Sequence, residues 1–347
     1  MINKSLFGVT KNGEEVYRYD LVTETASASI LTFGATIQSL IVPSKNGALD
    51  VVLGYDDILS YETLDSYLGA TVGRNCNRVK NAKFYLDGEV IYLNKNDGEN
   101  NLHGGYVGFS HRVWNVDSVS EEETSITLSL FSKSGEENFP ANLEVKVKYT
   151  LVGSELIVEY FGVSDGTTVC NLTNHSYFNL DGEGSPTAHD AFMKINADYT
   201  TEVEKGLIPT GNIVPVKNTP FDFTEFKQVK QDILSKDKQI EYMNGYDCNF
   251  CLKNNKNYEE VATLYSPNSG VQVSVLTNNY GLQIYTGYFL TERRGKGGKT
   301  YRQNTSICLE TQTYPDAVNN PNFPTSILKP NDKYYVKTAY AFSVKKD

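Results

Sequence analysis

One histidine and one glutamate stand in apolar surroundings where they could exchange protons with a bound substrate. His175 lies within residues 171–180, a stretch rich in hydrogen-bonding side chains, and an imidazole titrates near neutral pH. Glu310 follows Cys308 and Leu309, and an ionised carboxylate flanked in this way needs partners or a raised pKa. His175 could instead be a core histidine, and Glu310 a buried structural carboxylate. The two residues are candidates for a general acid and a general base.

Polar groups suited to holding a ligand occur in two further segments. Asn77 and Arg78 offer an amide beside a planar guanidinium with five donors, which fits vicinal hydroxyls or a carboxylate. His103 is followed by Gly104 and Gly105, so the backbone could approach a ligand closely there. A structural ion pair of Arg78 and a simple turn at His103 are the alternatives.

Motifs for nucleotides, zinc proteolysis and serine hydrolysis are absent from the sequence. It contains no GxGxxG, HExxH or GxSxG, and residues 298–300 end like a P-loop but have Arg293 where the first glycine belongs. Cys248 and Cys251 lack the second Cys or His pair of a zinc site, which favours two small buried residues in a strand. An acid–base set with neutral hydrogen-bonding side chains fits a sugar, and we expect no metal and no cofactor.

Composition narrows the partners and the compartment. The 347 residues include 32 Lys and Arg against 42 Asp and Glu, and the net charge of −10 argues against nucleic acid and anionic membrane as partners. Five cysteines are an odd number for a disulfide framework, and the first residues lack a basic and then apolar leader. No apolar stretch approaches the ~18 residues of a membrane span. A cytoplasmic protein with reduced thiols is the expectation.

The elements that must position these residues are strands. Alternating or β-branched and aromatic runs, such as residues 126–130, 145–151 and 334–344, predict half-buried strands, and Asx-Gly pairs such as those ending at Gly88 and Gly98 predict tight turns between them. Helical patterns occur only at residues 56–63 and 224–235. We therefore predict an all-β fold, a large antiparallel β-sandwich with a few short helices. The sequence shows no internal repeat and no linker, which predicts a single domain over residues 1–347.

The segments that carry chemistry resemble the aldose 1-epimerase (galactose mutarotase) family over nearly the whole chain. The resemblance rests on the order and spacing of several motifs: residues 31–37, 77–78, 102–105, 171–180, 245–247, 282–287 and 308–318 and the Phe-Pro pair at 323–324. It implies a mutarotase-like supersandwich with an open sugar cleft. It also implies a cofactor-free interconversion of the α and β anomers of hexopyranoses such as galactose and glucose.

The resemblance also implies a role for each matching residue. Glu310 corresponds to the general base and His175 to the general acid. The implied substrate contacts are Asn77, Arg78, His103, Asp247 and Gln283, with Ser176 and Tyr177 beside the acid. The sequence departs from the family pattern at Asn75, Cys76, Cys248 and residues 304–307, which leaves the preferred sugar open. The implied partner is a monosaccharide, and the protein is expected to be a monomer or a homodimer.

Three other functions remain open on the sequence. A hexose-6-phosphate 1-epimerase of the same fold could use the basic residues at 293–299 for a phosphate, although such a run is more typical of a solvated loop. A non-catalytic sugar-binding module would be expected to lack the acid or the base. A retaining glycosidase could pair Asp247 with Glu310 but leaves His175 without a task. For an epimerase, we expect an acidic limb of the pH profile from Glu310 and a basic limb from His175, with His111 and His189 as surface or turn residues.

Overall fold

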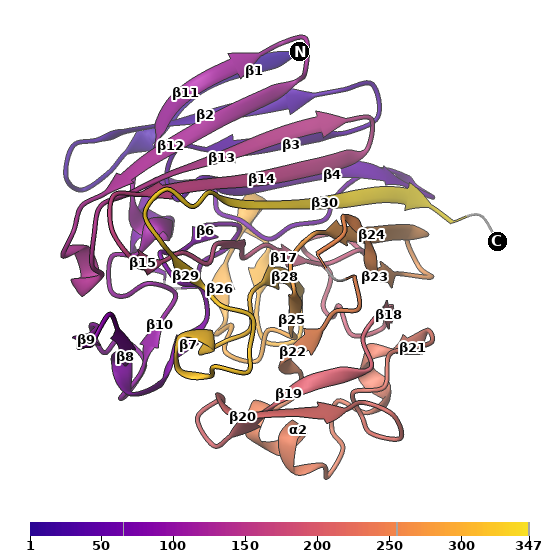
Figure 1. Ribbon diagram of the computed structural model, residues 1–347. Helices are drawn as coiled ribbons and strands as arrows, with labels where there is room; N and C mark the ends of the chain where they lie inside the picture. The colour runs from indigo at the N-terminus through magenta and orange to yellow at the C-terminus, as the bar shows by residue number, and fades with distance from the viewer. Residues whose placement is uncertain (65, 255, 346–347) are drawn as a thin grey trace.

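The computed structural model describes residues 1–64, 66–254 and 256–345, which form antiparallel sheets with two short α-helices (Figure 1). The five-stranded sheet has the order β1 (Ile2–Val9), β2 (Glu15–Val22), β3 (Ser27–Leu31), β4 (Thr36–Ser44), β5 (Gly47–Asp50). The nine-stranded sheet has the order β11 (Asn115–Ser120), β12 (Ser125–Ser132), β13 (Leu143–Val152), β14 (Glu155–Ser164), β30 (Tyr334–Val344), β24 (Val271–Thr277), β23 (Glu259–Tyr265), β18 (Phe192–Ile195), β21 (Lys227–Gln228). The six-stranded sheet has the order β17 (Tyr177–Phe178), β28 (Ile307–Gln312), β25 (Gly281–Tyr285), β22 (Asp247–Cys251), β19 (Tyr199–Glu204), β20 (Ile208–Pro215).

Short strand pairs connect these sheets and shape the loops. They are β7 (Arg78–Val79) with β10 (Asn101–Leu102), β6 (Thr71–Val72) with β16 (Thr173–Asn174), β8 (Lys83–Leu86) with β9 (Glu89–Tyr92), β15 (Thr168–Val169) with β29 (Ile327–Leu328), and β26 (Arg293–Arg294) with β27 (Thr300–Tyr301). Two of these pairs, β7–β10 and β6–β16, contain or directly precede polar residues singled out in the sequence. They bring segments about 20 and 100 residues apart into contact.

Alternation along the strands builds a large apolar core between the sheets. In β13 the residues from Leu143 to Leu151 alternate between buried apolar side chains and more exposed ones, which places a single face of the sheet against the interior. A continuous buried cluster joins side chains of all three sheets, such as Ile30, Val147 and Leu282. The prediction of an all-β antiparallel sandwich is confirmed.

Of the two predicted helices, one is confirmed and the other is wrong. Helix α1 (Ile58–Thr63) begins after Asp57, whose side chain accepts the Ser60 N–H as an N-cap. Residues 224–235 instead form β21 and a 3₁₀ turn at Val229–Gln231, because β21 pairs with β18 and this edge pairing outweighs the helical spacing.

The second helix lies just beyond the predicted range, at α2 (Lys238–Met243). Asp237 caps its first turn, and Asn244 ends it in the left-handed conformation, followed by Gly245. Asp237 and the Asn-Gly pair are the sequence signals that mark this helix. In the described residues no helix has the length and apolar character needed to cross a membrane.

Candidate active site

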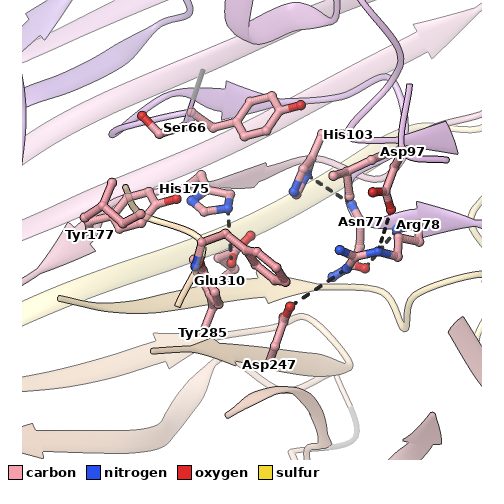
Figure 2. A pocket seen from close by; sticks show the side chains of 14 residues that line it. Ser66, Asn77, Arg78, Asp97, His103, His175, Tyr177, Asp247, Tyr285 and Glu310 are labelled. Carbon is pink, nitrogen blue, oxygen red and sulfur yellow. Dashed lines mark hydrogen bonds and ion pairs between the residues drawn. The ribbon is translucent and has the colours of Figure 1, made fainter. Parts of the chain in front are cut away.

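A pocket of about 220 Å³ opens where loops of the short strand pairs meet one face of the six-stranded sheet (Figure 2). Strands β28, β25 and β22 lie side by side in this sheet, and each supplies polar or aromatic side chains to the pocket. The wall is formed by Ser66, Tyr67, Asn77, Arg78, Asp97, Leu102, His103, His175, Tyr177, Asp247, Tyr285, Phe289, Leu290 and Glu310.

The predicted acid and base face each other in this pocket. Figure 2 shows His175 and Glu310 pointing toward one another, with His175 Nε2 lying 3.7 Å from Glu310 Oε1. Both side chains are almost fully buried, and Glu310 Oε2 has no hydrogen-bond partner. With no partner for Oε2, the carboxylate lacks a hydrogen bond that would stabilise its charge, which favours the uptake of a proton.

Burial shifts the titration of this pair in opposite directions. It lowers the pKa of His175 to about 4, because the charged imidazolium loses its hydration. Burial also raises the pKa of Glu310 well above its usual value, and the nearby charge of Asp247 adds to the shift. The resting pair therefore carries a neutral histidine at neutral pH, and its carboxylate takes up a proton more readily than an exposed glutamate does.

His103 is fixed as a hydrogen-bond donor to the pocket. Its Nδ1 accepts the backbone N–H of Asn77 at 3.2 Å, so the proton of the neutral ring resides on Nε2. Burial and then the neighbouring His175 and Arg78 lower the pKa of His103 well below its usual value, which keeps the ring neutral. Gly104 is needed for a different reason from the one inferred above, since a Cβ there would lie 2.0 Å from the carbonyl oxygen of Gly73. The backbone at Gly104 packs closely against the backbone at Gly73, and this contact, not an approach to a ligand, explains the glycine.

Arg78 joins two carboxylates at the pocket wall. Its Nε donates to Asp97 Oδ2 at 2.8 Å, and its Nη1 lies 3.9 Å from Asp247 Oδ2 (Figure 2). Asp247 also accepts a hydrogen bond from Gln283 at 2.6 Å. Burial raises the pKa of Asp247, whereas Arg78 and Gln283 oppose that shift. The arrangement holds a carboxylate and a guanidinium at the pocket surface, where both can bind hydroxyl groups.

Two residues implied as substrate contacts lie outside the pocket wall. Ser176 is buried and its hydroxyl donates to Asn174 Oδ1 at 2.6 Å, while Tyr177, the next residue, lines the pocket. Gln283 lies behind the wall, where its side chain holds Asp247. The structure thus brings together seven of the nine residues named from the sequence and assigns these two to the support of their neighbours.

Several wall residues were not named as site residues from the sequence. They are Ser66, Tyr67, Asp97, Leu102, Tyr285, Phe289 and Leu290. Asp97 had a signal, because it forms part of an Asn-Asp-Gly turn shortly before His103, but the sequence does not reveal its contact with Arg78. Leu102 and Tyr285 lie within motifs that carry the family resemblance, whereas Tyr67 and Phe289 had no signal, because the chain is rich in tyrosine and phenylalanine throughout.

The other two histidines lie outside the wall. His189 was expected in a turn or at the surface, but it is buried and its Nε2 bonds to the carbonyl oxygen of Thr286 at 3.2 Å. His111 is half-buried beside Phe33 and Tyr67. The five cysteines are all buried and unpaired, as expected for packing residues.

One group of side chains has the ligand types of a metal site. The donor atoms of His103, His175 and Glu310 lie within 4.8 Å of one another. A histidine ligand needs a lone pair on the nitrogen that faces the metal and usually donates its other N–H to an acceptor. His103 has the opposite arrangement, because its Nδ1 receives the Asn77 N–H. The group therefore fits proton transfer and hydrogen bonding to a ligand better than metal binding.

The two lysines of the basic segment at residues 293–299 are committed to structural contacts. Lys296 is buried, and its Nζ donates to Asp50 Oδ2 at 2.7 Å and to the carbonyl oxygens of Gln38 and Val52. Lys299 pairs with Glu183 at 2.7 Å. These lysines do not line the pocket and are not available to bind a substrate phosphate there.

The fold and the site together define a β-sandwich protein with a buried acid–base pair in an open pocket. Comparison with known proteins identifies the family: the profile described as Aldose 1-epimerase matches residues 17–341. The chain is 42% identical over 346 residues to galactose mutarotase of Sus scrofa, with 99% of each protein covered. It is 37% identical to aldose 1-epimerase of Haemophilus influenzae over 342 residues, covering 96% of this chain and 98% of the relative.

Solved structures agree with this assignment. The galactose 1-epimerase of Lactobacillus acidophilus superposes with a TM-score of 0.87 at 27% identity, covering 100% of this chain and 99% of the other. The aldose epimerase homologue of C. elegans gives a TM-score of 0.86 at 33% identity, covering 93% of this chain and 97% of the other. The chain belongs to the aldose 1-epimerase family.

Proposed function

We propose that this protein is an aldose 1-epimerase, an isomerase that interconverts the α and β anomers of hexopyranoses such as D-galactose and D-glucose. Membership of the family and the names of its relatives support the reaction class. The single structural observation that carries the proposal is the buried pair of His175 Nε2 and Glu310 Oε1, 3.7 Å apart at the wall of an open pocket.

The chemistry of anomerisation needs a pair of this kind. A base removes the proton from O1 while an acid protonates the ring oxygen O5, which opens the ring to an aldehyde. Rotation about C1–C2 presents the other face of the carbonyl, and closure reverses both proton transfers. Because O1 and O5 are bonded to the same carbon, a base and an acid a few ångströms apart can reach both atoms. Each positioned transfer accelerates the reaction by ~10²–10⁴.

In the proposed mechanism Glu310 takes the O1 proton through Oε1, the carboxylate oxygen that lies 3.7 Å from His175 Nε2. His175 delivers a proton from Nε2 to O5. The low pKa of the imidazolium makes this delivery favourable, and the raised pKa of the carboxyl makes Glu310 a stronger base than an exposed glutamate. Both shifts favour the forward transfers from the form of the pair in which His175 carries the proton and Glu310 is ionised.

The remaining polar residues position the sugar. His103 donates from Nε2 and Arg78 donates from its guanidinium, so both can hold hydroxyl oxygens and stabilise the charge that develops on ring opening. Asp247 accepts a hydroxyl hydrogen, and Asn77 donates or accepts from its side chain at the same edge. Tyr177 packs against His175 with a ring separation of 5.0 Å and fixes the orientation of the imidazole.

Three further proposals concern the molecule as a whole. Residues 1–347 function as a single domain, which the core shared by the three sheets supports. The protein works in the cytoplasm, which the five unpaired cysteines support. It acts as a monomer or a homodimer and takes a monosaccharide as its partner.

The alternatives find less support. A hexose-6-phosphate 1-epimerase needs cations for the phosphate, and Lys296 and Lys299 are engaged elsewhere. A non-catalytic binding module has no need for the buried pair. A glycosidase that uses Asp247 as its second carboxylate leaves His175 without a function.

Polarimetry on freshly dissolved α-D-galactose and α-D-glucose tests the proposal. We expect the protein to speed the relaxation to the anomeric equilibrium well beyond the spontaneous rate, and glucose 6-phosphate to be a poorer substrate. Relaxation at the spontaneous rate with both sugars would refute the proposed activity. A clear preference for glucose 6-phosphate would favour the phosphate-binding alternative.

A further inference from the structure

A chain of buried hydrogen bonds runs behind the pocket wall and ends on Asp247. Gln283 Nε2 donates to Asp247 Oδ1 at 2.6 Å, and Gln312 Nε2 donates to Gln283 Oε1 at 3.3 Å. The thiol of Cys76 completes the chain by donating to Gln312 Oε1 at 3.4 Å. All four residues are less than 9% exposed, so water does not compete for these contacts.

The direction of every bond in the chain follows from its two ends. An ionised Asp247 can only accept, so Gln283 must turn its amide nitrogen toward it. The carbonyl oxygen of Gln283 then faces Gln312 and requires a donor, which the amide nitrogen of Gln312 provides. The carbonyl oxygen of Gln312 is left facing Cys76, where burial raises the pKa of the thiol and keeps it protonated as a donor.

The fold brings these four residues together from strands β22, β25 and β28 and the loop before β7. Gln312 lies two residues after Glu310 on β28, and strand alternation places both side chains on the same face of the sheet. Gln283 stands opposite Glu310 in the β25–β28 register. Cys76 comes from the loop before β7, where its backbone N–H donates to the carbonyl oxygen of Asn171. The relay is thus attached to the strand that carries the general base.

We propose that Gln312 and Cys76 are positioning residues for substrate: acting through Gln283, they hold Oδ1 of Asp247 so that Oδ2 faces the pocket and accepts a sugar hydroxyl. This inference rests on the proposed function, in which Asp247 binds the substrate. Neither residue lines the pocket, and neither takes part in the proton transfers. Their loss should weaken sugar binding while chemistry in the bound complex continues.

The test compares variants that reverse, remove or preserve the donors. Gln312→Glu places an acceptor where Gln283 needs a donor, and we expect the Kd for D-galactose by calorimetry and the KM to rise about tenfold, the size of one lost charge-assisted hydrogen bond, with kcat within about twofold. Cys76→Val removes the terminal donor and should raise KM about threefold. Cys76→Ser keeps a donor at that position and should retain a KM close to that of the wild type.

A readout independent of catalysis separates this inference from the proposed function. The ¹³C NMR titration of the Asp247 carboxyl, which faces the charges of Arg78, Asp97 and Glu310, should move its midpoint up by about one pH unit in Gln312→Glu. If Gln312→Glu does not fold, Gln312→Met removes the donor without adding charge, and the same upward shift is expected.

The outcomes point to different conclusions. An unchanged midpoint, Kd and KM in a folded Gln312 variant would overturn the relay. A fall in kcat with unchanged Kd would also overturn it, because Gln312 would then act on the chemistry. If wild type lacks epimerase activity but the midpoint still shifts in Gln312→Met, which adds no charge, the relay stands and the proposed function fails.

Discussion

Replacing Glu310 by glutamine should separate chemistry from binding. The amide has nearly the shape of the carboxylate but cannot take the O1 proton, and His175 Nε2, 3.7 Å away, loses its partner in the concerted transfer. A positioned general base contributes ~10²–10⁴, so we expect kcat to fall about 10³-fold, or about 4 kcal/mol of barrier. The negative charge of Glu310 opposes that of Asp247, so its removal should leave KM within about threefold.

The assay is polarimetry with α-D-galactose over a range of concentrations, after subtraction of the spontaneous rate. Glu183→Gln is the matched control, because Glu183 is an equally buried carboxylate that bonds to Lys299 and Tyr301 away from the pocket. We expect the control to lower Tm and leave kcat and KM unchanged. If Glu310→Gln keeps more than a tenth of the wild-type kcat, Glu310 is not the base.

Three further predictions follow from contacts in and near the pocket. We expect the two limbs of the kcat/KM profile to belong to the opposite residues from those expected from the sequence. The rate should fall below about pH 4, where His175 becomes protonated while Glu310 already carries a proton. It should fall again at high pH, where Glu310, whose pKa is raised, loses the one proton that the pair still holds. A profile with an acidic limb near pH 6.5 that disappears in His175→Asn would contradict this order. Arg78→Lys keeps the charge but loses the Nε bond to Asp97, so KM should rise about tenfold with a smaller change in kcat; a larger loss in kcat than in KM would place Arg78 in the chemistry instead. Lys296→Met should lower the free energy of unfolding by about 1–3 kcal/mol in denaturant titrations, because half-buried Asp50 and two buried carbonyl oxygens lose the ammonium donor, and the folded variant should epimerise galactose normally.

The sequence predicts the architecture well because the determinants of strands are local. Alternation of apolar and polar residues in β13 and Asx-Gly turns specify antiparallel pairs without knowledge of distant segments. The failure at residues 224–235 has the opposite cause. Their helical spacing was correct as a local pattern, but pairing of β21 with β18 depends on Phe192 and Met193, more than 30 residues away.

In the candidate site, too, the sequence predicts what depends on local residue types and misses what depends on distant contacts. His175 and Glu310 could be identified because an acid or an imidazole among apolar residues is conspicuous in one dimension. Whether a polar residue faces the pocket or supports its wall depends on contacts that the sequence does not reveal. Gln283 stands opposite Glu310 in the sheet but bonds to Asp247, and Ser176, between β16 and β17, bonds to Asn174. Asp97 is the converse case: its contact with Arg78 depends on how the loop after β9 folds back on β7, and the residue type gives no indication of it.

The histidines show how burial, more than residue type, decides function in this protein. An exposed imidazole with its ordinary pKa would be half-protonated near neutral pH and would be a weak acid toward the ether-like O5. Burial lowers the pKa of His175 to about 4, so the protonated ring, when it forms beside Glu310, has a strong tendency to give up its proton. The same burial makes the carboxylate more basic. A sugar bound against the two groups offers a proton at O1 to Glu310 and a lone pair at O5 to the protonated His175. The pair can therefore exchange protons with the substrate. The hydrogen-bond donors of His103 and Arg78 then have only to hold the sugar in position while its ring opens and closes.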